Sequence, residues 1–580
     1  MPNPLRFVTH LAMFVVLSAS GAWLWMHHAQ AWDLGKRSPL LSYDAAQYVV
    51  AARELAQHGR FATLFALPLE LTRHPEAPWP LALVQPGLVI SEAALLRMTP
   101  GKTRVIEGQT TEILRPDQLE WTVLVIPYIC FIVIAVGLAL AVSHVLRRFA
   151  PGVSVLARAL AGTAVGCAFL LDPEAQHFAV GGFTELPFTL GLVGAVAALA
   201  LGIGPRLPLL FGLALGVTGA FRGTMLWLAP LLALGNAAAS TPDRRVRALV
   251  LTLVGYALPL VPWWLYKWQA FGTPAWDLSA LSIWDGVQGR TWFTLFHQPD
   301  FPDLPHGSVA LGLLFRKLMG NLPGVALSLA SGVRPLLVGS LVLWLVVARE
   351  APRTLRMAGL TLLAITLVNL VATALSVPQL RYLFPMRVVL DAAGLLALWG
   401  LIARAPTLAP GTRRLVAALA SLIVIAWGAH LTRLGNAEAH RTSFERGTPS
   451  TLSLLQIANI MNREIPAGEP VMSNLGPALA WEARRPVIHL VVSPDLLSTC
   501  RRRTDFRHVL LVFRGPEQAW PEWASVVARP PEALHRIEWN VRHVRVYQTA
   551  DGFNVVWLDL GPLGPELASA ALEPGAASAQ

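Results

Sequence analysis

The residues best suited to chemistry are one carboxylate and three cations that stand beside long apolar runs. Asp44 precedes an alanine-rich stretch that predicts an amphipathic helix ending near His58, with Gly59 as its C-terminal stop. A carboxylate at a helix N-terminus is stabilised by the helix dipole, so Asp44 could be a simple cap. The same position also suits a general base that removes a proton from an attacking hydroxyl or amine.

The three cations are Arg222, Lys267 and Arg381, each at the end of an apolar run. Arginine binds phosphate oxygens through its planar fork, and lysine adds a point charge, so these residues are candidates for binding a phosphate-bearing substrate. The alternative is that they only extend to lipid headgroups, which the neighbouring tryptophans favour for Lys267.

Other acidic residues are weaker candidates for a functional role. Glu185 begins another apolar run, where an ionisable residue is by default a functional candidate that could orient a sugar hydroxyl, hold a metal or pair with an arginine. Asp172 is followed by Pro173, which is also typical of the end of a helical span. Asp300 and Asp303 are close enough in the sequence that binding of a divalent cation remains an alternative. The three cysteines have no metal-ligand spacing, and no cofactor is predicted.

The composition defines the elements that must position these residues. Hydrophobic residues make up 54% of the 580 and charged residues only 14%, compared with about 25% charged residues in soluble domains. The apolar residues form runs of about twenty, the length that a helix needs to cross a bilayer, and backbone groups in lipid require helices there. The sequence therefore predicts a polytopic α-helical membrane protein.

Hydropathy predicts about eleven spans. They are 8–26, 121–145, 155–172, 184–202, 207–221, 223–236, 248–267, 329–348, 357–375, 385–403 and 414–431. Stretch 81–98 is also apolar but contains Pro86, Glu92 and Arg97, so we expect a juxtamembrane helix on the outer face instead of a span. Spans 207–221 and 223–236 are short and joined only by Arg222.

The net charge of +11 follows from arginines in the loops between spans and does not indicate binding of nucleic acid. With 81–98 outside the membrane, all strongly basic loops fall on one side, which the positive-inside rule assigns to the cytoplasm. The protein is thus predicted in the cell inner (plasma) membrane, with a cytoplasmic N-terminus and a periplasmic or extracellular C-terminus.

Three segments are expected on the outer side. Residues 1–431 form the transmembrane domain with outer loops 27–120 and 268–328. Residues 432–565 are richer in charge and contain short β-type runs and helical stretches, which predicts a small soluble α/β domain. The final residues, 566–580, are rich in Ala, Gly and Ser and predict a disordered tail.

Several motifs resemble, in chain order, those of the type C glycosyltransferases, nearest to the branch of protein mannosyltransferases and lipid A aminoarabinose transferases. The motifs are Tyr43-Asp44-Ala45-Ala46-Gln47-Tyr48, Pro78-Trp79-Pro80-Leu81, Asp172-Pro173 with Gly181–Phe188, Gly212–Phe221 leading into Arg222, Pro262-Trp263-Trp264 with Phe271-Gly272-Thr273-Pro274, and Gln379–Pro385. Asp44 is followed by Ala45, where many protein mannosyltransferases have Asp-Glu, which argues against that exact assignment.

The resemblance implies an inverting glycosyltransferase that uses a polyprenyl-phosphate-linked sugar and a lipid, glycan or protein acceptor. Asp44 would be the base, with Glu185 in support, and Arg222, Arg381 and Lys267 would hold the donor phosphate. Tyr43, Tyr48, His74 and Tyr382 are the candidates for further substrate contacts. The alternative is a transporter or flippase of polyprenyl or sugar lipids, which would be expected to show repeats and a midplane site.

Overall fold

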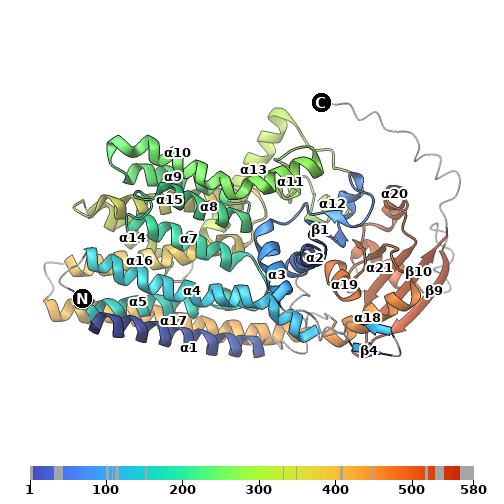
Figure 1. Cartoon of the computed structure of the whole chain (residues 1–580), viewed down its shortest axis with the longest axis horizontal. Helices are drawn as coiled ribbons and strands as arrows, with labels where there is room; N and C mark the ends of the chain where they lie inside the picture. Colours follow the sequence, from blue (N-terminus) through green and yellow to red (C-terminus); the bar gives the residue numbers. More distant parts are fainter. Residues whose placement is uncertain are drawn as a thin grey trace.

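A computed structural model of the chain describes residues 4–31, 43–98, 104–106, 109–111, 116–149, 153–330, 332–347, 349–404, 409–445, 449–515, 520–529 and 541–561. The predicted disordered tail, 566–580, lies outside these ranges. Most described residues form a long helical bundle, and a smaller α/β domain lies at one end of it (Figure 1). We call this end of the bundle the domain end, and the opposite end the basic end.

Each of the eleven predicted spans corresponds to a helix. These are α1 (Pro4–Ala31), α4 (Pro116–Phe149), α5 (Val155–Leu170), α7 (Glu185–Ala200), α8 (Pro208–Phe221), α9 (Met225–Ala239), α10 with α11 (Arg245–Ala257 and Val261–Phe271), α14 (Arg334–Val347), α15 (Arg353–Leu375), α16 (Phe384–Arg404) and α17 (Pro410–Glu445). Helix α17 continues beyond the predicted domain boundary at residue 432.

Among the described residues, six helices are long and apolar enough to cross a membrane, and up to eight spans result if each of two bent helix pairs counts as one. The three shorter apolar helices α7, α8 and α9 lie among them. At 1.5 Å per residue, the 14 residues of α8 and 15 of α9 extend only about 21–23 Å, less than the ~30 Å hydrocarbon core. The predicted class of polytopic helical membrane protein is confirmed.

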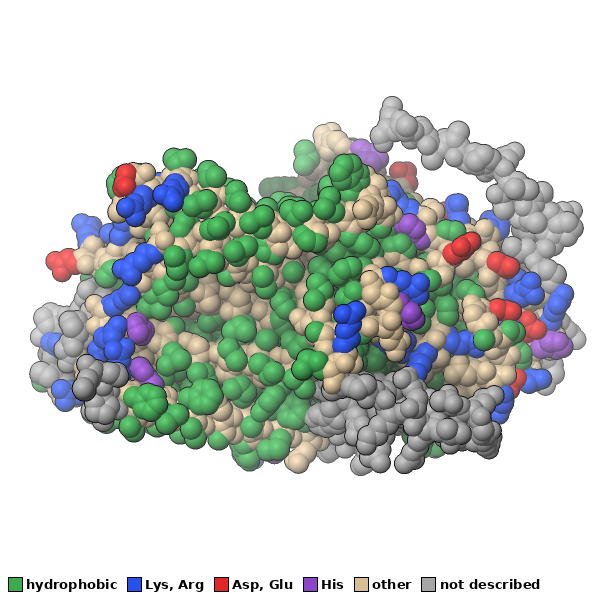
Figure 2. Space-filling model, in the orientation of Figure 1, with side chains coloured by type: hydrophobic (Ala, Val, Ile, Leu, Met, Phe, Trp, Pro, Cys, Tyr) green, Lys and Arg blue, Asp and Glu red, His purple; other side chains and the backbone are tan. Residues whose placement is uncertain are grey.

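Lysine and arginine side chains gather at the basic end, far from the α/β domain (Figure 2). The chain enters α1 at this end (Figure 1). The last turn of α4 contributes Arg147 and Arg148, and η3 with the first turn of α10 contributes Arg244, Arg245 and Arg247. These basic segments, which the sequence analysis assigned to one side of the membrane, therefore lie together at one end of the folded bundle.

The predicted juxtamembrane segment 81–98 forms α3 (Pro86–Met98), which lies between the bundle and the α/β domain with α2 (Tyr43–His58) (Figure 1). Helix α3 packs closely on the end of α8. A Cβ on Gly87 would lie 2.7 Å from the carbonyl oxygen of Ala220, so this contact requires glycine.

Further elements lie between or beside the span helices. They are β1 (Ala62–Thr63), η2 (Pro68–Thr72), β3 (Trp79–Pro80), β4 (Arg104–Ile106), β5 (Gln109–Thr111), α6 (Pro173–Ala179), η3 (Pro242–Arg244), η4 (Leu258–Leu260), η5 (Leu278–Trp284), α12 (Trp292–Phe296), α13 (Gly307–Leu329) and η6 (Leu380–Leu383). Helices α13 and α14 meet at 92°, and α5 and α6 at 67°.

The α/β domain has a six-stranded sheet in the order β2-β7-β6-β8-β10-β9. Its strands are β2 (Phe65–Ala66), β6 (Val471–Ser473), β7 (Val487–His489), β8 (His508–Phe513), β9 (Val541–Gln548) and β10 (Asn554–Leu560), and its helices are α18 (Thr451–Glu464), α19 (Gly476–Ala483), η7 (Pro494–Leu496), α20 (Leu497–Arg503) and α21 (Pro521–Val527). All six residues of the central strand β8 are buried, which explains its unbroken apolar run.

One strand of this sheet comes from the first outer loop. Strand β2 pairs in parallel with β7 through Phe65 with Val487 and Ala66 with Ile488. The sequence did not predict this pairing, because a two-residue strand has no periodicity to detect. The sheet thereby joins the loop that carries Asp44 to the C-terminal domain.

Candidate active site

The candidate site begins at Asp44 in the first turn of α2. Ala45, Ala46, Val49 and Val50 of this helix are fully buried, so α2 is fixed by packing on several sides. The Asp44 carboxylate stays partly accessible, with 38% of its side chain exposed. Rigid placement of an accessible carboxylate is what a general base requires.

Arg381 is the partner of Asp44. It lies in η6, immediately before α16, and its Nη1 donates a hydrogen bond of 2.6 Å to Oδ2 of Asp44. Its Nη2 donates to the hydroxyl of Tyr382 at 3.2 Å. Nε of Arg381 is buried and has no hydrogen-bond partner among the described residues, so this guanidinium retains a donor for a further acceptor.

A second ion pair joins Arg222 to Glu185 at 3.0 Å. Arg222 connects α8 to α9 in an extended conformation, and Glu185 begins α7. Only 13% of the Arg222 side chain and 4% of the Glu185 side chain are exposed, so this pair is much less accessible than the first.

Tyr382 connects the two ion pairs. The guanidinium carbon of Arg222 lies 5.2 Å from the centre of its ring, and that of Arg381 lies at 5.1 Å. Both distances are within the range of cation–π attraction. The four charged residues and this ring therefore form one cluster, which we call the Asp44 cluster.

Tyr48, one helical turn after Asp44, is partly buried beside the same cluster. Burial, and then the negative charge of Asp44, raise the pKa of Tyr48, and its hydroxyl shares a hydrogen bond with the side chain of Thr184. Tyr48 therefore remains a neutral hydroxyl at physiological pH. Thr184 and Phe188 belong to the predicted motif Gly181–Phe188, but the contact of Thr184 with Tyr48 and that of Phe188 with Arg222, at 5.9 Å, were not predicted. An apolar span does not show which of its faces points to a site.

Three other predicted residues, Lys267, His74 and Tyr43, lie outside this cluster. Lys267 is buried with its ammonium 5.3 Å from the ring of Trp263, and Asp277 is its electrostatic partner. His74 faces the carbonyl oxygen of Ala270 at 3.0 Å. Their roles stay predictions.

Tyr43 precedes Asp44 but points into the interface with the α/β domain. Its ring contacts Phe65, Trp292 and His489 at centroid distances of 5.4–5.8 Å. It contributes to the docking of α2 instead of lining the Asp44 cluster.

The second outer loop contributes surface contacts. Asp300 forms an exposed ion pair of 2.6 Å with Arg503, and the backbone carbonyl of Asp303 accepts a hydrogen bond from Arg290. Within the described ranges, no group of three or more His, Cys, Asp or Glu side chains could hold a metal ion.

The comparisons with known proteins come from structure alone. No protein-family model matches the sequence, and no curated protein matches it. Among solved structures, the chain is similar to ArnT from Cupriavidus metallidurans bound to undecaprenyl phosphate, with 13% identity, a TM-score of 0.50, and 94% of this chain and 97% of the other covered.

A second neighbour is the archaeal oligosaccharyltransferase AglB from Archaeoglobus fulgidus in complex with an inhibitory peptide and a dolichol-phosphate. The identity is 12%, the TM-score is 0.50, and 94% of this chain and 74% of the other are covered. The Archaeoglobus fulgidus oligosaccharyltransferase with zinc and sulfate has a TM-score of 0.53 at 12% identity, with 94% of this chain and 72% of the other covered. These neighbours are members of one superfamily, and the chain therefore has the fold of the type C glycosyltransferases.

Proposed function

We propose that the protein is a membrane glycosyltransferase that transfers a sugar from a polyprenyl-phosphate donor to an acceptor at the domain end of the bundle. The observation that carries this proposal is the Asp44 cluster. It brings together an accessible carboxylate and two arginines from segments of the chain that are far apart. The fold supports it, and so do the undecaprenyl phosphate and dolichol-phosphate bound to the ArnT and AglB neighbours.

The partly accessible ion pair between Asp44 and Arg381 provides a way to couple donor binding to base activation. The donor phosphate would compete with Asp44 for Arg381, because a guanidinium binds phosphate oxygens through the same planar fork as a carboxylate. Arg222, held by Glu185, would contribute the second positive charge. Asp44 would then be released from its ion pair beside the reacting sugar.

In the reaction, the acceptor hydroxyl or amine attacks the anomeric carbon from the face opposite the phosphate, and Asp44 takes the proton of the acceptor. The bond between the anomeric carbon and the phosphate oxygen breaks, and both electrons leave with the lipid phosphate. The arginines stabilise the negative charge that grows on this leaving group. A single in-line displacement inverts the anomeric configuration.

The membrane orientation belongs to the same proposal. Basic loops lie at the end of the bundle far from the α/β domain (Figure 2), and the positive-inside rule supports a cytoplasmic location for that end. The α/β domain and the site would then face the periplasm or the extracellular space, where an acceptor lipid, glycan or protein would be met.

The decisive experiment compares envelope glycans and lipid A by mass spectrometry in a strain that lacks the gene and is complemented with variants. The unaltered gene should restore a sugar addition that Asp44→Asn does not restore. Asp300→Asn is the matched control, because it removes a carboxylate from another Asp–Arg pair of 2.6 Å. Full activity of Asp44→Asn would contradict the assigned base.

A transporter or flippase is the alternative function. It would move the lipid-linked sugar without new bond formation, so purified protein in vesicles would change the sidedness of a labelled lipid without forming a glycosylated product. Location of the Asp44 cluster at one end of the bundle favours the transferase, because transporters place the substrate near the bilayer midplane.

A further inference from the structure

A crevice separate from the Asp44 cluster opens between α5, α14, α16 and α17. It contains about 680 Å³ of non-protein space, part of it open to solvent, and none of the residues of the Asp44 cluster lines it. Its walls are mostly apolar and include Phe169, Leu395, Val424 and Trp427. The charged side chains that line the crevice are those of Asp172, Arg334 and Asp391.

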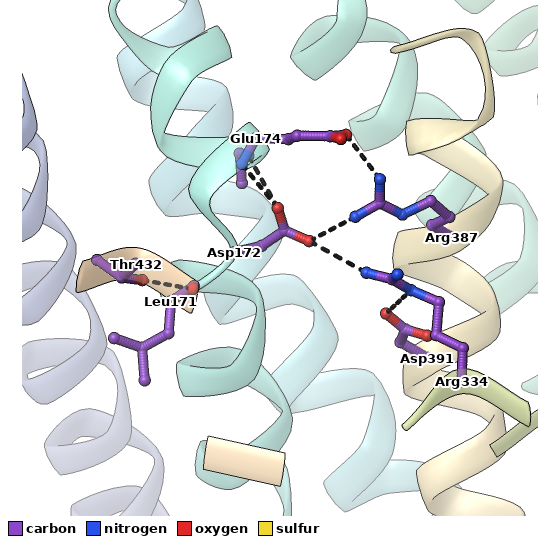
Figure 3. Close-up of polar contacts among 8 residues, drawn as sticks. Leu171, Asp172, Glu174, Arg334, Arg387, Asp391 and Thr432 are labelled. Carbon is purple, nitrogen blue, oxygen red and sulfur yellow. Dashed lines mark hydrogen bonds and ion pairs between the residues drawn. The ribbon is translucent and has the colours of Figure 1, made fainter. Parts of the chain in front are cut away.

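These three residues belong to a network of five charged side chains (Figure 3). Oδ1 of Asp172 caps α6, and its Oδ2 lies 3.3 Å from Arg387 and 4.0 Å from Arg334. Arg387 also pairs with Glu174 at 2.8 Å, and Arg334 with Asp391 at 3.3 Å. The network thus ties the break between α5 and α6 to the first turns of α14 and α16.

The charges of this network do not balance. In the ion pairs among the described residues, three carboxylates, from Asp172, Glu174 and Asp391, face the two guanidinium groups of Arg334 and Arg387 (Figure 3). Oδ1 of Asp391 is buried without a hydrogen-bond partner among the described residues. A buried carboxylate oxygen that lacks a donor is costly, so this position favours a ligand with a positively charged donor.

The surroundings are those of a lipid site. Helices α5 and α14 have 16 and 14 residues, so they extend about 24 Å and 21 Å, less than the ~30 Å thickness of a hydrocarbon core. The crevice adjoins an apolar cavity of about 800 Å³, with Leu138 and Ala392 lining both. Helix α17, which forms one wall, is mostly exposed along its apolar length.

We propose that this crevice binds one phospholipid with an ethanolamine headgroup. The ammonium group donates to Oδ1 of Asp391, the phosphate lies against Arg334, and an acyl chain follows the apolar wall toward Leu138. A polyprenyl phosphate fits less well, because it would bring only negative charge to a network that already has an excess carboxylate. A choline headgroup has the charge but no N–H to donate.

The test uses the full chain purified in detergent and native mass spectrometry with palmitoyl-oleoyl phosphatidylethanolamine, phosphatidylcholine or phosphatidylglycerol. One phosphatidylethanolamine should be retained, with an affinity about tenfold above that of the other two, the ratio expected for one hydrogen bond between charged groups. Undecaprenyl phosphate should not displace it, because the proposed donor site lies elsewhere. Equal retention of the three lipids, or displacement by undecaprenyl phosphate, would overturn the proposal.

Asp391→Asn should remove the preference for ethanolamine while Asp243→Asn, an exposed acidic residue at the basic end, should keep it. If Asp391→Asn retains the tenfold preference, the excess charge is balanced in another way and the site is not as proposed. The comparison of headgroups on the unaltered protein decides the question even if the Asp391 variant does not fold.

Discussion

At the scale of single residues, the two ion pairs of the Asp44 cluster differ in their access to solvent. The side chains of Asp44 and Arg381 are about one third exposed, whereas Glu185 and Arg222 are nearly buried. An exposed pair contributes little to stability and can exchange partners, whereas a buried pair is costly to break. This contrast separates the expected effects of substitutions on function from those on stability.

Asp44→Asn should leave the protein folded and inactive. Loss of the partly exposed pair with Arg381 should change the free energy of unfolding by about 1 kcal/mol, whereas loss of a general base lowers turnover by roughly 10²–10⁴-fold. Thermal unfolding of the purified protein, measured beside a transfer assay, checks both effects. A large loss of stability would mean that Asp44 is chiefly a structural residue.

In contrast to Asp44→Asn, Glu185→Gln should mainly reduce the stability of the protein. It leaves the Arg222 guanidinium buried without its counter-charge, which should cost about 3–5 kcal/mol of stability. Thermal melting in the same detergent measures this loss, with the exposed pair variant Asp300→Asn as control. An unchanged melting temperature would show that Arg222 finds another partner or water.

The sequence could place the charged residues on one side of the membrane but not in contact. Asp44 and Arg381 are 337 residues apart, and both arginines lie near the ring of Tyr382. The topology followed from apolar runs and basic loops, which have strong physical signals. Contacts such as Thr184 with Tyr48 depend on the rotation of each helix, and a uniformly apolar span does not encode rotation. The contacts of Tyr43 with Trp292 and His489 were not predicted, because these residues are far from Tyr43 in the sequence.

At the scale of elements, two histidines lie at the contact between the second outer loop and strand β7. His297 and His489 have ring centroids 4.3 Å apart. Burial lowers the pKa of His297 to about 4. Burial, and then repulsion from His297, lower the pKa of His489 well below its usual range. Both rings are therefore neutral in the folded protein at pH 7.

This pair should make docking of the outer loop sensitive to acid. Because the folded pKa lies below the unfolded value of 6.5, the unfolded state binds more protons between these values, and stability falls as the pH drops from about 6.5 toward 4. For His297 the loss reaches about 3 kcal/mol at the acidic limit. The melting temperature measured from pH 7.5 to 4.5 checks this slope.

His297→Gln should flatten that dependence, whereas His58→Gln, on the exposed end of α2, should leave it unchanged. An identical pH dependence in the unaltered protein and in His297→Gln would assign the acid sensitivity to other groups.

At the scale of the whole molecule, the bundle and the α/β domain share structural elements. Arg53 of α2 is buried and donates hydrogen bonds to the carbonyl oxygens of Trp481 at 2.6 Å and Ala480 at 2.9 Å. With β2 in the same sheet as β7, this contact makes the first outer loop a part of the C-terminal domain in space. The domain therefore supports the element that carries Asp44.

We predict that Arg53→Gln weakens this connection and separates the unfolding of the two parts. Each hydrogen bond from a charged group contributes about 1.5–3 kcal/mol, so the α/β domain should become the less stable unit. Hydrogen exchange of β7 and α19 would report earlier opening. The control is Arg60→Gln, which removes a half-exposed arginine from the same loop; equal protection in both variants would contradict a supporting role for Arg53.

The recruitment of β2 into the C-terminal sheet also sets the order in which the molecule can be built. Arg53 and Trp481 are separated by 428 residues, and at 5–20 residues per second the ribosome needs roughly 20–90 s between them. During that interval the loop with Asp44 has left the ribosome but has no sheet to join. The first outer loop is thus synthesised early but reaches its final packing late. The protein acquires its finished site only when almost all of its chain has been made.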